Sequence, residues 1–208
     1  MTELIIESGS CHMNKLSYMK EYVAECSLND FHYLKFQLFP KEMTGPNIWL
    51  DPVLFEEVFH WGKSISDIKI FASVWDQASM DLLIHLKAPC IKFAYSQRNS
   101  PLISQALDEF EKVFVSYGFL DEIPDYPNLV PLFCEPVYPV VYNLDFRGIF
   151  SKFHSFSDHT IGIHQAQKAL AFCPRYIEKH VTLPHKDISC PDARFSTSFN
   201  QLRFLNLL

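Results

Sequence analysis

The chain has 208 residues, of which 48% are hydrophobic and 20% charged, and its formal net charge is −6. This composition is ordinary for a folded globular protein, and the length favours one domain over residues 1–208. The acidic balance argues against nucleic acid as the main partner, because binding to phosphate backbones requires a basic face. The sequence contains no run of about 18 apolar residues, so we expect no membrane span. The acidic start MTELIIESGS is unlike a signal peptide, so we expect a cytoplasmic protein.

Short apolar runs alternate along the chain with stretches of helical periodicity. Eight runs are predicted to be strands, at residues 4–8, 32–39, 67–76, 90–96, 112–117, 129–136, 154–160 and 176–183. Seven stretches are predicted to be helices, at residues 15–26, 51–64, 77–87, 100–110, 143–153, 162–173 and 198–208. A helix follows every predicted strand except the fifth, where GFLDEIPDYPN (118–128) contains two prolines and predicts a loop.

Repeated strand–helix units predict a parallel sheet, because parallel neighbours need a crossover connection. Eight units predict a trimmed (β/α)8 barrel of the TIM type without the fifth helix, with an open doubly wound sheet as the alternative. The glycine-rich phosphate loops typical of nucleotide-binding α/β folds are absent, which disfavours that alternative. The loop KEMTGPNIWL (41–50) is the best candidate for a mobile lid.

The cysteines form no C-x-x-C pair, and most of them lie in apolar runs. There are six, namely Cys11, Cys26, Cys90, Cys134, Cys173 and Cys190. We therefore expect reduced, buried thiols rather than a zinc or redox motif.

Polar residues at the carboxyl ends of barrel strands face the active site. Because side chains alternate along a strand, Lys35 and Gln37 share the inward face of YLKFQLF, and Lys92 points inward from CIKFAYS. Two lysines inside a barrel are costly unless they meet anions, which a phosphorylated or carboxylated ligand supplies. Buried pairs with Glu7 or Glu178 are the alternative.

Two histidines end adjacent predicted strands at matched positions. His159 shares one face of FSDHT with Ser157, and His180 shares one face of YIEKHVTL with Glu178. Neighbouring strands lie roughly 5 Å apart, so the pair predicts a divalent metal site that keeps positions open for water and substrate. A single strand histidine is more often a hydrogen-bonded core residue, but the matched pair favours metal.

Three carboxyl-terminal motifs, FSDHTIGI, YIEKHVTL and CPDARFS, resemble S-D-H-T-x-G-I, I-E-K-H-F-T-L and G-P-D of the N-acetylneuraminate (sialic acid) synthase family. Upstream, IIESGSCH, LKFQ, IKFAYSQRNSPLI, FVSYG and FCEPVYP resemble further family motifs in the same order. That family condenses phosphoenolpyruvate with an N-acetylated hexose, giving a nine-carbon acid and phosphate. The resemblance covers the chain from about residue 4 onward and implies a barrel enzyme, a transferase of this type.

The resemblance implies roles by position. His159 and His180 would bind the divalent metal, manganese first, with magnesium or cobalt as alternatives. Glu7, beside the reacting carbons, would handle water or proton transfer, and with Lys35 and His159 it makes up the implied catalytic set. The positions implied for phosphoenolpyruvate and the hexose are Lys35, Gln37, Lys92, Ser96, Ser116, Tyr138, Ser157 and Asp192.

Four positions depart from the family pattern. Cys11 and Pro136 replace asparagines, Tyr95 replaces a serine that Ser96 follows, and Gln97 replaces a glutamate that contacts the sugar. The chain is also expected to lack the family's C-terminal antifreeze-like domain. These departures motivate an alternative, a catalytically impaired relative that acts as a binding or assembly subunit. A related aldolase for seven- or eight-carbon acids is a third interpretation, and either a homodimer or a partner chain in place of the missing domain stays open.

Overall fold

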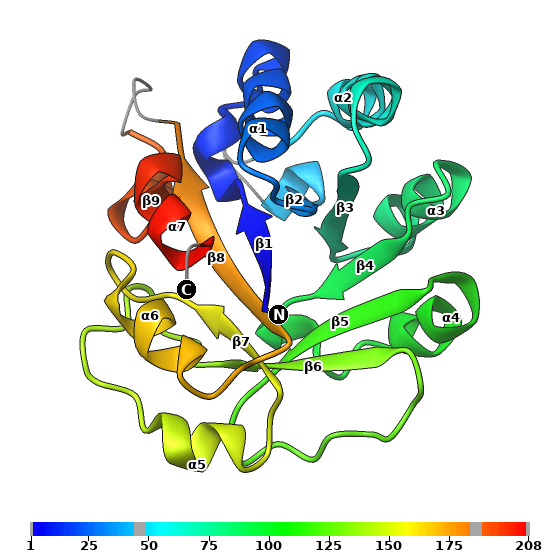
Figure 1. Cartoon of the computed structure of the whole chain (residues 1–208). Coiled ribbons are helices and arrows are strands. Elements are labelled where there is room, and N and C mark those ends of the chain that lie inside the picture. Colours follow the sequence, from blue (N-terminus) through cyan, green and yellow to red (C-terminus); the bar gives the residue numbers. More distant parts are fainter. Residues whose placement is uncertain (1, 44–48, 184–188, 207–208) are drawn as a thin grey trace.

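The computed structural model describes residues 2–43, 49–183 and 189–206 of the chain. Eight parallel strands form a closed barrel surrounded by helices, because β1 (Glu3–Glu7) pairs with both β2 (Tyr33–Leu38) and β8 (Tyr176–Thr182) (Figure 1). The predicted TIM-type barrel is therefore confirmed, and closure excludes the open doubly wound sheet.

Every predicted strand and helix is present, with ends that differ by three residues or fewer. The remaining barrel strands are β3 (Lys69–Val74), β4 (Cys90–Phe93), β5 (Lys112–Tyr117), β6 (Leu129–Cys134) and β7 (Ser155–Asp158). The helices are α1 (Leu16–Leu28), α2 (Pro52–Ile65), α3 (Gln77–His85), α4 (Leu102–Glu109), α5 (Phe146–Phe150), α6 (His164–Leu170) and α7 (Phe199–Asn206). The chain passes from β5 to β6 without a helix, as the two prolines in that segment predict.

Five short elements were not predicted from the sequence. They are the 3-10 helices η1 (Gly9–His12), η2 (Lys41–Met43), η3 (Tyr95–Gln97) and η4 (Pro191–Arg194), and the strand β9 (Thr197–Ser198). Each spans two to four residues, which is too short for hydrophobic periodicity to reveal. Residues 44–48 of the predicted lid lie outside the described residues, so the lid stays a prediction.

Local sequence signals explain where α2 and α3 begin. The Asp51 carboxylate accepts a hydrogen bond from the Val53 amide at 2.9 Å, and Pro52 occupies the first position of α2. Asp76 caps α3 in the same way, through the Ser79 amide at 2.8 Å. These caps satisfy amides that have no partner within the helix. None of the described helices is long and apolar enough to cross a membrane.

The interior of the barrel is divided into an apolar floor and a polar layer above it. The floor contains Tyr33, Phe71, Phe114 and Tyr176, whose rings meet at centroid distances between 5.1 and 6.4 Å. Side chains alternate along each strand, so moving two residues from Tyr33 toward the carboxyl end of β2 reaches Lys35 on the same inward face. The floor closes one end of the barrel, and the polar residues face the other end.

The cysteine prediction is wrong for three of the six residues. Cys11 and Cys190 form a disulfide, and Cys173 is exposed. The two bonded cysteines are 179 residues apart, and closure of the barrel brings η1, after β1, against η4, after β8. The other three, Cys26, Cys90 and Cys134, are free and buried as expected.

Candidate active site

A cavity of about 560 Å³ opens at the carboxyl ends of the strands. Its lining includes all the predicted site residues except Glu7, which is fully buried. A larger groove, of about 680 Å³, lies at the opposite end of the barrel and is lined by Lys63, Lys69 and Glu109 among others. We place the candidate active site in the smaller cavity, because barrel enzymes use the carboxyl-terminal face and the buried ionisable groups converge there.

Two lysines and two glutamates form a buried ionic network at the bottom of this cavity. Lys35 Nζ contacts Glu7 Oε2 and lies 3.0 Å from Glu178 Oε2. Lys92 Nζ lies 3.3 Å from Glu178 Oε1 and donates a hydrogen bond to Ser116 Oγ at 2.8 Å. The predicted alternative, buried pairs with Glu7 and Glu178, is therefore present. Lys35 and Lys92 also line the cavity, so these pairs leave both lysines within reach of a ligand.

The two carboxyl groups of the network differ in protonation. Burial raises the pKa of Glu7 to about 7, although the Lys35 charge opposes this. Burial acts on Glu178 in the same direction, but the charges of Lys35 and Lys92 outweigh it and hold its pKa well below the ordinary range. Ser157 Oγ adds a hydrogen bond to Glu178 Oε1 at 2.7 Å. Glu178 is thus a permanent anion, whereas Glu7 exchanges its proton near neutral pH.

His159 and His180 lie at the rim of the cavity with their ring centroids 5.6 Å apart. Burial lowers the pKa of each imidazole to about 3, so both rings are neutral at physiological pH. His159 Nδ1 lies 3.2 Å from the Glu135 carbonyl oxygen, to which it donates if it carries the proton. That tautomer leaves the lone pair on Nε2, on the ring edge near Ser157 Oγ.

This donor set fits a divalent metal with two protein ligands. Both imidazoles are neutral, and His180 Nδ1 is buried with no hydrogen-bond partner among the described residues. The described residues contain no cluster of three or more His, Cys, Asp or Glu side chains around one metal position. A metal held here would therefore depend on water or substrate oxygens for its other ligands.

A second buried ion pair fixes the backbone beside both histidines. Lys179 Nζ lies 3.2 Å from Asp158 Oδ2 and also contacts the Thr160 carbonyl oxygen. Asp158 Oδ1 accepts hydrogen bonds from the Thr160 amide and hydroxyl at 2.8 and 2.7 Å. Asp158 precedes His159, and Lys179 precedes His180. Asp158 and Lys179 are register partners on β7 and β8. The pair therefore ties together the strand ends that carry the imidazoles.

Aromatic rings form much of the upper wall of the cavity. The Tyr138 ring lies 4.2 Å from the His159 ring, and the Phe195 ring lies 4.7 Å from the His180 ring. On the opposite side, Phe39 stacks on Trp75 at 3.7 Å. Rings of this kind bind the apolar faces of a polar ligand while nearby side chains make hydrogen bonds.

Sequence reasoning did not place several lining residues in the site, namely Phe39, Ser73, Trp75, Glu178, Arg194 and Phe195. Ser73 could have been found, because it lies two residues after inward-facing Phe71 on β3. The alternation of β8 did put Glu178 on the inward face, but only as a pairing partner. Arg194 and Phe195 lie in or beside the short element η4, which gave no periodic signal.

The comparisons with known proteins agree with the barrel fold. Residues 138–206 match the model of the NeuB family. The chain is 25% identical over 249 residues to N,N′-diacetyllegionaminic acid synthase of Campylobacter jejuni, covering 98% of this chain and 74% of that protein. It is 28% identical over 120 residues to pseudaminic acid synthase of the same species, covering 54% and 34%. The structure of N-acetylneuraminic acid (sialic acid) synthetase from Leptospira borgpetersenii superposes with a TM-score of 0.80 at 20% identity, covering 98% and 81%.

The fold and the cavity define a TIM-type barrel protein with a buried cationic site at its carboxyl-terminal face. The similarity to the NeuB family model covers residues 138–206 of this barrel.

Proposed function

We propose that this protein condenses phosphoenolpyruvate with an N-acetylated hexose similar to N-acetylmannosamine, giving a nine-carbon acid of the sialic type and phosphate. The observation that carries the proposal is the cavity in which Lys35 and Lys92 lie close to two neutral imidazoles. The relatives named as synthases of legionaminic, pseudaminic and sialic acid support a product of the same class.

The cationic side of the cavity would bind phosphoenolpyruvate. Lys35 and Lys92 supply the positive charges, and Ser116 and Ser157 line the same surface with hydroxyl groups. Both hydroxyls already take part in the network, through Lys92 and Glu178, so their orientations are fixed before a ligand arrives. Fixed donors and charges suit the recognition of phosphate and carboxylate oxygens.

Gln37, Tyr138 and Asp192, which line the same cavity, would bind the hexose, and Ser96 would be a further substrate-binding residue. His159 and His180 would hold manganese, or alternatively magnesium or cobalt, and the bound metal would polarise the aldehyde of the hexose. The enol carbon then attacks this aldehyde, water adds at the former enol carbon, and phosphate leaves by C–O cleavage. Glu7, whose pKa lies near 7, is suited to give or take a proton in these steps.

The position of Tyr95 bears on the alternative of an inactive binding subunit. The Arg98 guanidinium lies 4.1 Å from the centre of the Tyr95 ring, and Arg98 Nε lies 3.1 Å from Asp121 Oδ2. Tyr95 is thus held at the cavity wall, and Lys92 and Ser116 line the cavity together with it. Because Lys92 and Ser116 remain at the cavity surface beside Tyr95, the position of Tyr95 supports turnover over the inactive alternative.

Calorimetric titration of phosphoenolpyruvate into manganese-loaded protein tests this proposal. We expect binding that is lost or weakened in the His159→Ala/His180→Ala variant. The exposed pair His60→Ala/His85→Ala is the matched control and should bind as the unmodified protein does. Phosphate release is then measured with N-acetylmannosamine and other N-acetylated hexoses. Failure to bind phosphoenolpyruvate, or binding without release of its phosphate in the presence of any of these sugars, would overturn the proposal.

A further inference from the structure

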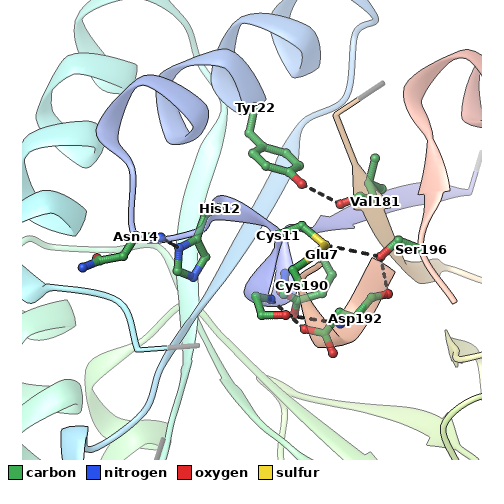
Figure 2. The surroundings of a disulfide bond; sticks show 11 residues. Glu7, Cys11, His12, Asn14, Tyr22, Val181, Cys190, Asp192 and Ser196 are labelled. Carbon is green, nitrogen blue, oxygen red and sulfur yellow. Dashed lines mark hydrogen bonds between the residues drawn. A yellow bond between two sulfur atoms is a disulfide. The ribbon is translucent and has the colours of Figure 1, made fainter. Parts of the chain in front are cut away.

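A disulfide joins the first and last segments that border the cavity. Cys11 in η1 is bonded to Cys190, the residue before η4, with their Cα atoms 5.4 Å apart (Figure 2). Both side chains are buried. Cys11 stands at one of the positions where the sequence departs from the family pattern, so the bond is a feature of this chain that the resemblance does not imply.

Asp192 lines the cavity two residues after Cys190, and η1 fixes its position. The Ser10 amide donates a hydrogen bond to Asp192 Oδ2 at 2.6 Å, and the Asp192 amide donates one to Ser10 Oγ at 3.3 Å. A side chain at Gly9 would place its Cβ 2.4 Å from Asp192 Oδ2 and 2.9 Å from His180 Nδ1. The carboxylate is therefore packed tightly between η1 and β8.

The contact between η1 and Asp192 also holds the other cavity-lining residues of η4 in place. Pro191, Asp192 and Arg194 line the cavity, as does the following residue, Phe195, whose ring packs on His180. Ser10 makes two hydrogen bonds from η1 to Asp192 of η4. A four-residue 3-10 helix has little internal hydrogen bonding to hold its shape. The disulfide is the covalent part of this attachment.

We propose that the Cys11–Cys190 disulfide is a positioning link that holds Asp192 and η4 against the end of β1, and that its reduction releases the hexose side of the site while leaving the phosphoenolpyruvate side intact. The proposal rests on the function proposed above, because it assigns Asp192 to the hexose. The anion-binding lysines lie on β2 and β4, which the bond does not join. Loss of the link should therefore act on one substrate and not on the other.

The reduction balances with a dithiol as the reductant. The S–S bond breaks, each cysteine sulfur gains one electron and one proton, and the dithiol becomes a cyclic disulfide. Exchange proceeds by attack of a thiolate on one of the two sulfurs. Because both are buried, the η1–η4 contact must open before attack, so we expect reduction to be slow in the folded protein.

Counting thiols tests whether the bond exists. Denatured, air-oxidised protein should react with four equivalents of a thiol reagent, and protein first treated with dithiothreitol should react with six, since the chain has six cysteines and one disulfide. Peptide mapping should recover Cys11 linked to Cys190. Six reactive thiols in the oxidised sample would overturn the proposal.

Hydrogen–deuterium exchange tests the positioning role without depending on catalysis. Reduction, or the Cys11→Ser/Cys190→Ser substitution, should accelerate amide exchange in residues 190–196 by about tenfold or more, because the local opening free energy falls. Dithiothreitol should have no effect on the double variant. The exposed-thiol variant Cys173→Ser is the matched control and should behave as the unmodified protein does. Equal exchange in the oxidised and reduced proteins would overturn the proposal.

Kinetics on oxidised protein, and on reduced protein freed of dithiothreitol under nitrogen, separate the two substrates. We expect KM for N-acetylmannosamine to rise about tenfold on reduction, because one ordered side chain and its loop are released. The affinity for phosphoenolpyruvate should change by less than about twofold. Weakening of both substrates alike would overturn the proposal. If neither form releases phosphate, the proposed function fails, and the exchange experiment still decides the fate of the positioning link.

Discussion

Replacement of Glu178 by glutamine is the most informative single change in the ionic network. Glu178 Oε2 lies 3.0 Å from Lys35 Nζ and its Oε1 lies 3.3 Å from Lys92 Nζ, both in a buried environment. Glutamine keeps the shape and the acceptor for the Ser157 hydroxyl but removes the charge. Lys35 retains its ion pair with Glu7, whereas Lys92 retains its hydrogen bond to the neutral Ser116 hydroxyl.

The substitution should lower the stability of the fold and raise the affinity for phosphoenolpyruvate. Breaking a buried pair by removing one partner costs about 3–5 kcal/mol, so the free energy of unfolding of Glu178→Gln should fall by that amount. An anion in the cavity would escape repulsion from the lost carboxylate. At a separation of about 7 Å and an effective dielectric constant near 20, that repulsion is about 2 kcal/mol, or roughly 30-fold in affinity. The variant should therefore be less stable and yet bind phosphoenolpyruvate more tightly.

Urea denaturation followed by circular dichroism in phosphate-free buffer measures the first effect, and calorimetry with phosphoenolpyruvate measures the second. Glu57→Gln is the matched control, because Glu57 pairs with Lys20 at 3.1 Å on the surface. That substitution should change stability by less than about 1 kcal/mol. A stability loss for Glu178→Gln no larger than that of the control, or weaker binding of phosphoenolpyruvate, would refute the charge reasoning.

Two further predictions concern buried groups around the site. Lys179→Met should lower the free energy of unfolding by about 3–5 kcal/mol, because it leaves the buried Asp158 without its cationic partner. Adding Asp158→Asn should restore part of this loss, and urea denaturation measures both effects. No loss of stability in the single variant would contradict a buried ion pair. Burial lowers the pKa of His12 from its ordinary value of 6.5 to about 4. The unfolded chain therefore takes up the proton first, and stability falls by about 3 kcal/mol as the pH drops from 6.5 to 4. His12→Gln should flatten this decline whereas exposed His60→Gln should not, and parallel curves for all three proteins would disprove the assignment.

The barrel was predictable because its signals are local and repeated. Each strand carries a short apolar run, and α2, α3 and α5 begin at the capping residues Asp51, Asp76 and Asp145, so neighbouring signals agree on the same fold. Alternation along β2 was sufficient to point Lys35 and Gln37 inward, and both lie at the cavity. The closed parallel barrel then brings these side chains to one rim without any further information.

Pairing within the site was not predictable in the same way. Alternation places Lys35, Lys92 and Glu178 on inward faces, but it does not say that one carboxylate serves both lysines. The Cys11–Cys190 bond depends on contact between η1 and η4, which are too short to give a periodic signal and lie at opposite ends of the chain. Contacts of this kind follow from how the barrel closes rather than from any local pattern.

The charge balance inside the barrel indicates the charge of the ligand that the cavity favours. Lys35 and Lys92 bring two positive charges into a site that lies above an apolar floor of aromatic rings. Glu178 remains ionised and cancels one of them, but the raised pKa of Glu7 makes its carboxylate an incomplete counterion near neutral pH. Buried pairing and anion binding, which were alternatives from the sequence, are therefore compatible. The ion pairs with the glutamates stabilise the buried lysines inside the barrel. The glutamates neutralise only part of the lysines' positive charge, and the remainder favours a small polyanion in the cavity.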